Sequence, residues 1–217
     1  MNPHHLEPTC PLCKNSTRWF HSDRRRHYYQ CPTCALVHVP KDWQLDATAE
    51  KAVYDQHQNI PDDPDYRQFL SRLADPLLSK LPPASQGLDF GCGPGPALAA
   101  MLSEAGHSMA LYDLYYFPRP EVFGQQWDFI TATEVVEHLA DPQRELQRLW
   151  GCLKPGGWLG IMTKRVEDPA AFGNWHYKND PTHISFFAAS TFAWLAQQWE
   201  AEVEFCGRDT VLIQKRP

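Results

Sequence analysis

Short apolar runs separated by helical patterns organise residues 87–217. Four of these runs end at glycine, proline or charged positions, which predicts buried strands. They cover residues 88–90, 107–112, 127–132 and 158–163. Between the runs, apolar side chains recur every three or four residues, as at Leu146, Leu149 and Leu153, which predicts helices that pack on a sheet. Strands that alternate with helices predict an α/β fold, with helices on both faces of a mainly parallel sheet.

Residues 41–86 predict two connecting helices. The segment 46–58 is polar with a few small apolar residues on one side, and the segment 66–81 places apolar residues at helical spacing. The sequence IPDDP at 60–64 interrupts the helical pattern, and two prolines at 82 and 83 end the second helix. Residues 1–40 then form a separate small module, and residues 87–217 form the main domain.

The N-terminal module predicts a hairpin with strands at 17–20 and 27–30. The tip at 22–26 carries three adjacent arginines, next to Tyr28 and Tyr29. Such a cluster could grip RNA or another anionic partner. A solvated turn is the simpler explanation of the same residues.

The composition limits the other partners. The chain has 217 residues and a net charge of -6, which argues against a chain-wide nucleic-acid surface but not against a local basic patch. No apolar run approaches the roughly 18 residues of a membrane span, and the first ten residues contain no apolar signal core. We therefore expect a cytoplasmic protein without a membrane span.

Four of the 7 cysteines form two CxxC pairs near the N-terminus. Cys10 and Cys13 are separated from Cys31 and Cys34 by a spacing that is typical of zinc sites. Four thiolates can complete a tetrahedral Zn²⁺ shell, and a segment of about 40 residues needs such a link to be stable. The pattern predicts a structural zinc ribbon. Disulfides are the less favoured alternative in a reducing compartment.

The sequence GLDFGCGPGP at 87–96 predicts a strand, a glycine turn and the start of a helix. It lacks both the G-x-G-x-x-G spacing of dinucleotide-binding turns and the lysine of a P-loop. Asp113 follows the next predicted strand, where one carboxylate can accept both hydroxyls of a ribose.

A second group of polar residues directly follows the strand at 127–132. If this segment is helical or nearly so, Glu134, Glu137 and His138 lie on one face. Two carboxylates and an imidazole suit a divalent cation such as Mg²⁺. The same residues also suit a segment that shapes the neighbouring pocket without binding metal.

The glycine turn with Asp89 before it, the run TEVVEHL and the turn LKPGG at 153–157 together resemble class I S-adenosylmethionine (SAM) methyltransferases. The resemblance covers most of residues 87–163 and implies a Rossmann-like sheet. It implies that Asp89 holds the amino-acid end of SAM, that SAM lies on the turn formed by Gly91, Gly93 and Gly95, and that Asp113 binds the ribose. Only residues 114–126 occupy the place of the family's third strand. That strand is therefore vestigial or absent, and the adenine contacts stay unassigned.

The E-x-x-E-H run also resembles O-methyltransferases of ubiquinone biosynthesis and small-RNA 2′-O-methyltransferases, in which it coordinates metal beside the acceptor hydroxyl. The sequence THISFF at 182–187 resembles a loop of the ubiquinone enzymes, which implies that His183 is a fourth ligand or the general base. In many methyltransferases the helices before the glycine turn form a lid. Tyr54, His57 and Asn59 would then face the cofactor or the acceptor.

These features predict a SAM-dependent methyltransferase that acts on an oxygen nucleophile of a small-molecule or macromolecular acceptor, which the zinc ribbon presents or recognises. One alternative is an RNA base methyltransferase, with nucleic acid as a less favoured partner. Another is a zinc-ribbon interaction protein that keeps the SAM fold without turnover.

Overall fold

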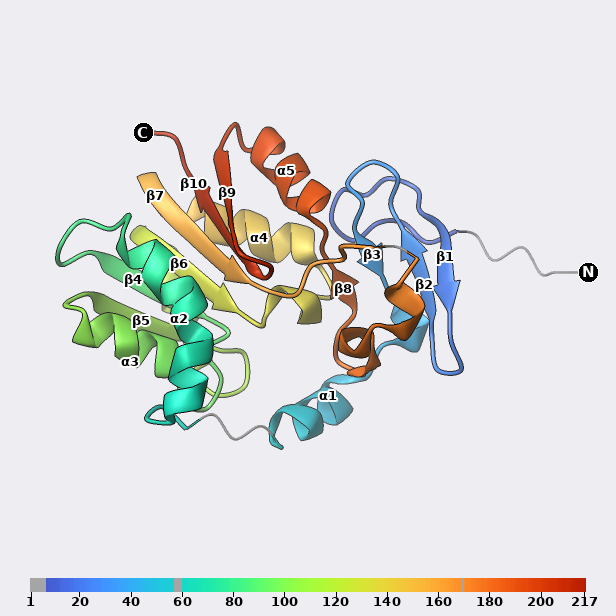
Figure 1. Ribbon diagram of the computed structural model, residues 1–217, viewed down its shortest axis with the longest axis horizontal. Helices are drawn as coiled ribbons and strands as arrows, with labels where there is room; N and C mark the ends of the chain where they lie inside the picture. The colour runs from blue at the N-terminus through green and yellow to red at the C-terminus, as the bar shows by residue number, and fades with distance from the viewer. Residues whose placement is uncertain (1–6, 57–59, 169) are drawn as a thin grey trace, which may run out of the picture.

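The structure is a computed structural model, and it describes residues 7–56, 60–168 and 170–217. Within these ranges a six-stranded sheet with the order β5-β4-β6-β7-β10-β9 forms the centre (Figure 1). Its strands are β4 (Gln86–Phe90), β5 (Ser108–Tyr112), β6 (Trp127–Thr133), β7 (Leu153–Met162), β9 (Glu202–Cys206) and β10 (Thr210–Gln214). Strands β5, β4, β6 and β7 are parallel, and β10 is antiparallel to both of its neighbours. The predicted α/β fold is confirmed.

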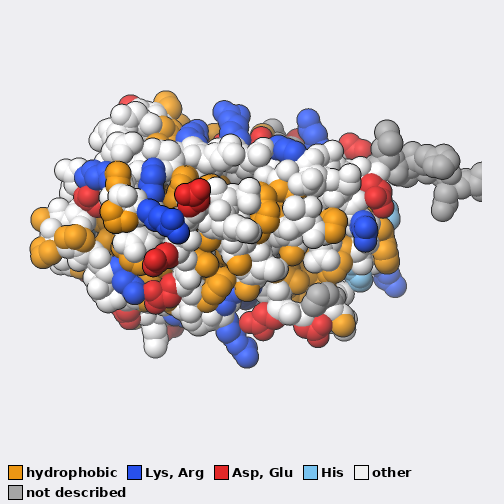
Figure 2. Space-filling model, turned by 90° about the horizontal axis from the view of Figure 1, so that it is seen from above, with side chains coloured by type: hydrophobic (Ala, Val, Ile, Leu, Met, Phe, Trp, Pro, Cys, Tyr) orange, Lys and Arg blue, Asp and Glu red, His pale blue; other side chains and the backbone are white. Residues whose placement is uncertain are grey.

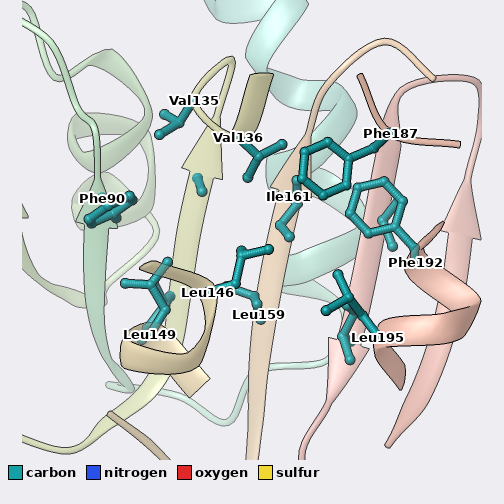
Figure 3. Close-up of a cluster of buried hydrophobic side chains, with 14 of the residues drawn as sticks. Phe90, Val135, Val136, Leu146, Leu149, Leu159, Ile161, Phe187, Phe192 and Leu195 are labelled. Carbon is teal, nitrogen blue, oxygen red and sulfur yellow. The ribbon is translucent and has the colours of Figure 1, made fainter. Parts of the chain in front are cut away.

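Helices cover both faces of this sheet. They are α2 (Pro64–Leu78) and α3 (Ala97–Glu104) on one face, and α4 (Pro142–Gly151) and α5 (Ala189–Gln198) on the other. Successive residues of a strand point to opposite faces. In β6, Phe129 packs with Leu73 of α2, whereas Ile130 belongs to the cluster that contains Leu149 of α4 and Leu195 of α5 (Figure 3).

Strand β7 begins earlier than the sequence pattern predicts. The expected turn at 154–157 lies inside the strand, because the pairing with β6 changes from Trp127↔Leu153 to Phe129↔Trp158. The intervening residues form a bulge, in which Gly156 has a φ of 78° that favours glycine. The turn and the strand are therefore one element.

The connection between β5 and β6 contains a short 3₁₀ helix, Pro120–Gly124, and no strand among its described residues. Of the two alternatives left open by the sequence, the structure has the smaller sheet. Because no strand follows on its outer side, β5 forms the edge of the sheet.

A second sheet joins the N-terminal module to a distant part of the chain. Its order is β1-β2-β3-β8. The strands are β1 (Arg18–Ser22), β2 (His27–Gln30), β3 (Val37–His38) and β8 (Ser185–Phe186). Strand β8 pairs with β3 through Val37↔Phe186 and His38↔Ser185. This sheet thus crosses the boundary at residue 40 that the sequence pattern suggests.

The hydrophobic core is also continuous across that boundary. Leu12 and Leu36 of the N-terminal module are buried in the same cluster as Leu146 and Leu195 from the helices of the main sheet. The module therefore packs on the main domain.

On the face shown in Figure 2, basic side chains are interspersed with acidic ones. In the described ranges, every helix is too short or too polar to cross a membrane.

Candidate active site

A cavity of about 790 Å³ lies at the carboxyl ends of β4, β5 and β6. The glycine turn and Asp113 form one side of it, and Glu134, His138 and His183 form another. Helix α1 (Ala47–Tyr54) and the start of α2 also contribute to its lining. The edge where parallel strands end is the usual place for a ligand in such a fold.

The glycine turn has the geometry that requires glycine. Gly91 and Gly93 have φ values of 73° and 63°. A Cβ atom at Gly91 would lie 2.4 Å from Cγ2 of Val135, so the turn also packs too closely for a side chain. Both residues line the cavity, whereas Gly95 is buried outside its lining, where its carbonyl accepts a hydrogen bond from the Ala97 amide (2.8 Å).

Asp89 is a buried carboxyl group at the end of β4 that lines the cavity. Its Oδ1 accepts a hydrogen bond from Thr131 Oγ1 (2.8 Å). Burial raises the pKa of Asp89 to about 7, and the nearby Asp113 adds to the increase. A cationic group bound beside Asp89 would favour its ionised form.

Asp113 is held by the backbone around it. Its Oδ2 accepts from the Gly93 amide (3.0 Å), and its Oδ1 accepts from the amides of Tyr115 (2.8 Å) and Tyr116 (3.1 Å). A carboxylate has about four lone pairs, so three amides leave room for a further donor on Oδ2. Asp113 therefore keeps one lone pair on Oδ2 for a donor from outside the protein.

The segment that contains the E-x-x-E-H run is not an α-helix. Glu134 has a φ of 53°, an unfavourable value for a non-glycine residue, and only Val136–His138 form a short 3₁₀ turn. The predicted helical geometry is wrong, because the chain turns sharply after β6. Glu134 consequently points differently from Glu137 and His138.

Glu137 and Glu134 share a tyrosine that the sequence analysis did not identify. The Tyr177 hydroxyl donates to Glu137 Oε1 and lies 3.2 Å from Glu134 Oε2. Glu137 is fully buried, and desolvation together with the charge of Glu134 raises its pKa to about 8. Desolvation raises the pKa of Glu134 to about 7. The two carboxylates thus resist simultaneous ionisation without a compensating cation.

Three donors converge on one point beside the cavity. Ligand atoms of Glu137, His138 and His183 all lie within 4.8 Å of one another, and Glu134 is outside this group. Nδ1 of His138 lies 3.2 Å from the Thr182 carbonyl, and Nδ1 of His183 lies 2.7 Å from the Tyr177 carbonyl. With Nδ1 protonated as a donor, each ring presents Nε2 as its basic nitrogen.

The four N-terminal cysteines lie together. The sulfur of Cys10 is 3.6 Å from that of Cys34, and the sulfur of Cys13 is 3.3 Å from that of Cys31. A tetrahedral Zn²⁺ with four thiolates at about 2.3 Å has sulfur–sulfur distances of about 3.8 Å, whereas a disulfide requires about 2.05 Å. The spacing of the sulfurs fits the metal.

Both CxxC turns have the same backbone geometry. Lys14 follows the first pair and has a φ of 60°, and Ala35 follows the second pair and has a φ of 61°. Their amides donate back to the carbonyls of Cys10 (3.0 Å) and Cys31 (2.9 Å). Two non-glycine residues in this rare conformation indicate that a common geometric requirement acts on both turns.

Helix α1 covers one side of the cavity. Glu50 accepts hydrogen bonds from Tyr54 (3.0 Å) and from Tyr115 (2.7 Å), and Asp55 accepts from Tyr116 (2.8 Å). The helix ends at Tyr54, earlier than the polar pattern predicts, and residues 57–59, including His57 and Asn59, lie outside the described residues. Tyr54 does line the cavity.

The three adjacent arginines differ in their exposure. Arg26 and Tyr28 are buried, and the Arg26 guanidinium donates to backbone carbonyls of residues 178–183. Arg24 and Arg25 are exposed. The group of three adjacent free cations that could grip an anion is therefore not formed.

Sequence reasoning missed Glu50, Tyr115 and Tyr177. Glu50 is one acid among several on a polar helix, and the two tyrosines lie in segments without a regular period. The weak signal was the position of Tyr115 two residues after Asp113, at the end of a strand. No sequence feature links Tyr177 to Glu137.

Comparisons with known proteins identify the fold independently. A profile of the methyltransferase domain family matches residues 57–204. One similar solved structure is 1,6-didemethyltoxoflavin-N1-methyltransferase from Burkholderia thailandensis, with bound 1,6-didemethyltoxoflavin and S-adenosylhomocysteine. The two sequences are 16% identical, and the match covers 92% of this chain and 100% of that chain with a TM-score of 0.53. A SAM-dependent methyltransferase from Archaeoglobus fulgidus is also 16% identical, and the match covers 69% of this chain and 94% of that chain with a TM-score of 0.53. No curated protein matches the chain.

Proposed function

Since this chain belongs to the methyltransferase domain family and is a SAM-dependent methyltransferase, we propose that it methylates an oxygen nucleophile with the help of a divalent cation. The observation that carries the proposal is the convergence of Glu137, His138 and His183 beside the cavity. A hydroxyl group must lose its proton to attack the methyl group of SAM, and this cluster places bases where the acceptor would lie.

The cavity suits the charge of SAM. We assign the amino-acid end of SAM to the side lined by Asp89, Gly91 and Gly93, and the ribose to Asp113. SAM carries a sulfonium and an ammonium group, and the buried carboxyl group of Asp89 and the partly buried one of Glu134 would stabilise them at short range. Methyl transfer from an activated sulfonium needs mainly positioning of the two reactants and removal of one proton.

The donors beside the cavity fit a divalent cation. Glu137 Oε2 is buried and has no hydrogen-bond partner among the described residues, and the basic nitrogens of the two histidines belong to the same group. One carboxylate and two imidazoles are a suitable ligand set for a borderline or hard divalent ion. A bound ion would lower the pKa of the acceptor hydroxyl. His183 would either complete the ligand set of the ion or receive the proton of the acceptor, because one ring nitrogen cannot do both.

We also propose that Cys10, Cys13, Cys31 and Cys34 bind a structural Zn²⁺. The sulfur distances and the matched turns support this assignment. Four protein ligands leave no open position, so this metal would take no part in the chemistry. The RNA base methyltransferase alternative rested on the zinc ribbon and the three arginines, and it loses one of those arginines because Arg26 is buried. The interaction protein without turnover is set aside because the chain is an enzyme.

The cation can be tested by titrating Mn²⁺ or Mg²⁺ into the zinc-loaded protein by calorimetry. We expect one site that Glu137→Gln abolishes while SAM affinity stays within about twofold, since Glu137 does not line the SAM cavity. Glu134→Gln is the matched control, because Glu134 lies outside the ligand group and its substitution should retain the ion. Equal binding in wild type and Glu137→Gln would contradict the metal site.

The acceptor atom can be tested with methyl-labelled SAM and fractionated lysate. We expect the label in an O-methyl group of the acceptor, identified by mass spectrometry. A label found on nitrogen or carbon would overturn the oxygen specificity and leave the methyltransferase assignment intact.

A further inference from the structure

We propose that Arg26, at the tip of the N-terminal hairpin, is a positioning residue for the active-site segment 177–183, and that the zinc-bound cysteines fix Arg26 in place. The proposal rests on the proposed function in taking residues 177–183 as part of the active site and the four N-terminal cysteines as a zinc site. Under this proposal the N-terminal module contributes to catalysis by positioning the segment 177–183, rather than by presenting the acceptor.

Arg26 holds the backbone of this segment at four points. Its Nη1 donates to the carbonyls of Pro181 (3.1 Å) and His183 (2.8 Å), and its Nη2 donates to those of Asp180 (3.0 Å) and Lys178. Only 6% of Arg26 is exposed. The guanidinium group is planar and presents its donors in a fixed geometry, so four carbonyls bound to it define the path of the segment.

Asp23 provides a second attachment at the same tip. Its Oδ1 accepts from the amides of Arg25 (2.8 Å) and Arg26 (3.0 Å), and its Oδ2 accepts from Lys178 Nζ (2.7 Å) and the Tyr28 hydroxyl (3.0 Å). Lys178 is 4% exposed and the Asp23 side chain 24%, so the cationic half of this ion pair is buried and the carboxylate is partly exposed. Asp23 therefore fixes the turn that orients Arg26 and also binds the opposing segment directly.

The far end of the segment is fixed by the same module. Val39 donates to the Ile184 carbonyl (2.9 Å), and β3 pairs with β8 immediately after it. Residues 178–186 are thus attached to the N-terminal module at both ends, and Ile184 and Ser185 also bond to Glu137 and Leu139 after β6. The module therefore shares with the turn after β6 the positioning of this segment.

The segment connects directly to the reacting centre. Tyr177 donates to Glu137, and its carbonyl lies 2.7 Å from Nδ1 of His183. A displacement of this backbone would rotate His183 and withdraw Tyr177 from the carboxylates. Reactive groups that are misplaced by about 1 Å lose much of their catalytic effect.

The zinc site lies at the base of the hairpin that carries Arg26. Cys13 precedes β1, and Cys31 directly follows β2, so the cysteine cluster joins the two ends of the hairpin. Such a metal link limits how the two strands can shift relative to each other. The path from the metal to His183 therefore passes through β2 and Arg26.

Hydrogen exchange followed by mass spectrometry tests this path without any acceptor. In Arg26→Ala, we expect amides of residues 178–184 to exchange at least tenfold faster, while those of residues 87–93 are unchanged. Arg26→Lys keeps the charge but loses the planar fork, and should give an intermediate increase. Arg24→Ala, at the exposed neighbouring position, is the matched control and should exchange as wild type. Unchanged protection of 178–184 in both Arg26 variants would overturn the proposal.

The role of zinc is tested by chelation of the full chain. Metal removal from the wild type should raise the exchange rate of residues 178–184 to the rate seen in Arg26→Ala. Metal removal from Arg26→Ala itself should raise that rate little further. If chelation leaves this segment protected, or adds the same increase in both proteins, zinc does not act through Arg26. Should Arg26→Ala fail to fold, Arg26→Lys and Asp23→Asn carry the same comparison.

A catalytic measurement separates positioning from general damage. With an acceptor in hand, Arg26→Lys should lower kcat roughly tenfold and change the affinity for SAM less than twofold, because the glycine turn and Asp113 lie outside the segment. Parallel losses of kcat and SAM affinity would overturn the positioning role. If no acceptor is methylated by the wild type, the proposed function fails while the exchange results still decide the role of Arg26.

Discussion

At the scale of single residues, the active site is a group of carboxyl groups that burial makes difficult to ionise. Asp89, Glu134 and Glu137 are each largely removed from water, and desolvation is the largest cause of their raised pKa values. Cations bring such groups back to their ionised form. The electrostatics of the empty cavity therefore favour a positively charged cofactor and, beside Glu137, a metal ion.

The affinity for SAM should depend on pH through Asp89. With a pKa of about 7, Asp89 is increasingly protonated below pH 7 and loses its attraction for the ammonium group. We expect the affinity for SAM to rise as pH increases through 7, by at most about tenfold per pH unit. At pH 6, binding of SAM should release a proton. Calorimetry in two buffers of different ionisation enthalpy measures the affinity and the number of protons released. Asp89→Asn should bind more weakly and lose this part of the slope, and an unchanged slope would contradict the assignment.

Asp89 also makes the stability of the ligand-free protein depend on pH, and its contribution to this stability falls as pH rises. Because the pKa of Asp89 is higher in the folded state than its ordinary value of 3.8, the native protein binds this proton more tightly than the unfolded chain does. The contribution of Asp89 to the free energy of unfolding therefore falls as pH rises from about 4 to 7. Relative to Asp89→Asn, ligand-free wild type should lose stability over this range in urea denaturation. A constant difference between the two proteins would contradict the raised pKa.

Asp113 should contribute to binding through one hydroxyl of the ribose. Asp113→Ala removes this charged acceptor and should weaken SAM binding by roughly 1–3 kcal/mol. It also releases the amides of Gly93, Tyr115 and Tyr116, so part of the loss comes from the turn. Calorimetry with S-adenosylhomocysteine gives the affinity, and thermal unfolding controls for the fold. An affinity equal to that of wild type would refute the ribose assignment.

At the scale of elements, the arrangement depends on how segments without regular structure are held. Helix α1 is tied to the connection after β5 by hydrogen bonds from Tyr115 and Tyr116 to Glu50 and Asp55. The segment after β7 is tied to the hairpin by Arg26. The first attachment joins two segments that line the cavity, and the second holds the segment that contains His183.

Removing one hydroxyl from the α1 attachment should speed the release of SAM. Tyr115→Phe deletes the hydrogen bond to Glu50, worth about 1 kcal/mol, and should raise the dissociation rate roughly fivefold. Stopped-flow displacement of bound cofactor measures the rate. Tyr29→Phe on β2 loses the same atom away from the cavity and should match wild type. Equal rates in all three proteins would show that α1 does not retain the cofactor.

At the scale of the whole molecule, the N-terminal module and the main domain form one structure. They share a hydrophobic cluster that includes Leu36 and Leu195, and β8 completes the sheet of the module. Loss of the metal should therefore affect the entire chain. A module that was only tethered would unfold by itself.

Cys31→Ser tests this cooperativity. The variant should release zinc, measured by elemental analysis, and should unfold in a single transition at a lower temperature than wild type, because the cysteines lie in the shared core. Calorimetry distinguishes the outcomes. A second transition that remains at the wild-type temperature would show that the module is independent.

The sequence by itself determined the elements and most of the local chemistry. The strands, the helices, the glycine turn with Asp89 and the CxxC pairs follow from periodicity and from residue types a few positions apart. These patterns depend only on residues within one helix, strand or turn, so they can be interpreted without knowledge of the fold. The prediction from residue spacing was wrong for residues 134–138. It assumed a helix, which the sharp turn at Glu134 after β6 prevents.

Only the tertiary structure decided which segments meet. The pairs Arg26 with His183, Val37 with Phe186, and Tyr177 with Glu137 join residues far apart in the chain. The first two depend on a backbone carbonyl and on strand pairing, which any residue can provide, and the third joins two side chains with no sequence relation. For this reason the sequence left the arginines either as a solvated turn or as a grip for an anion, and only the fold shows that Arg26 is turned inward to bond the segment 178–183.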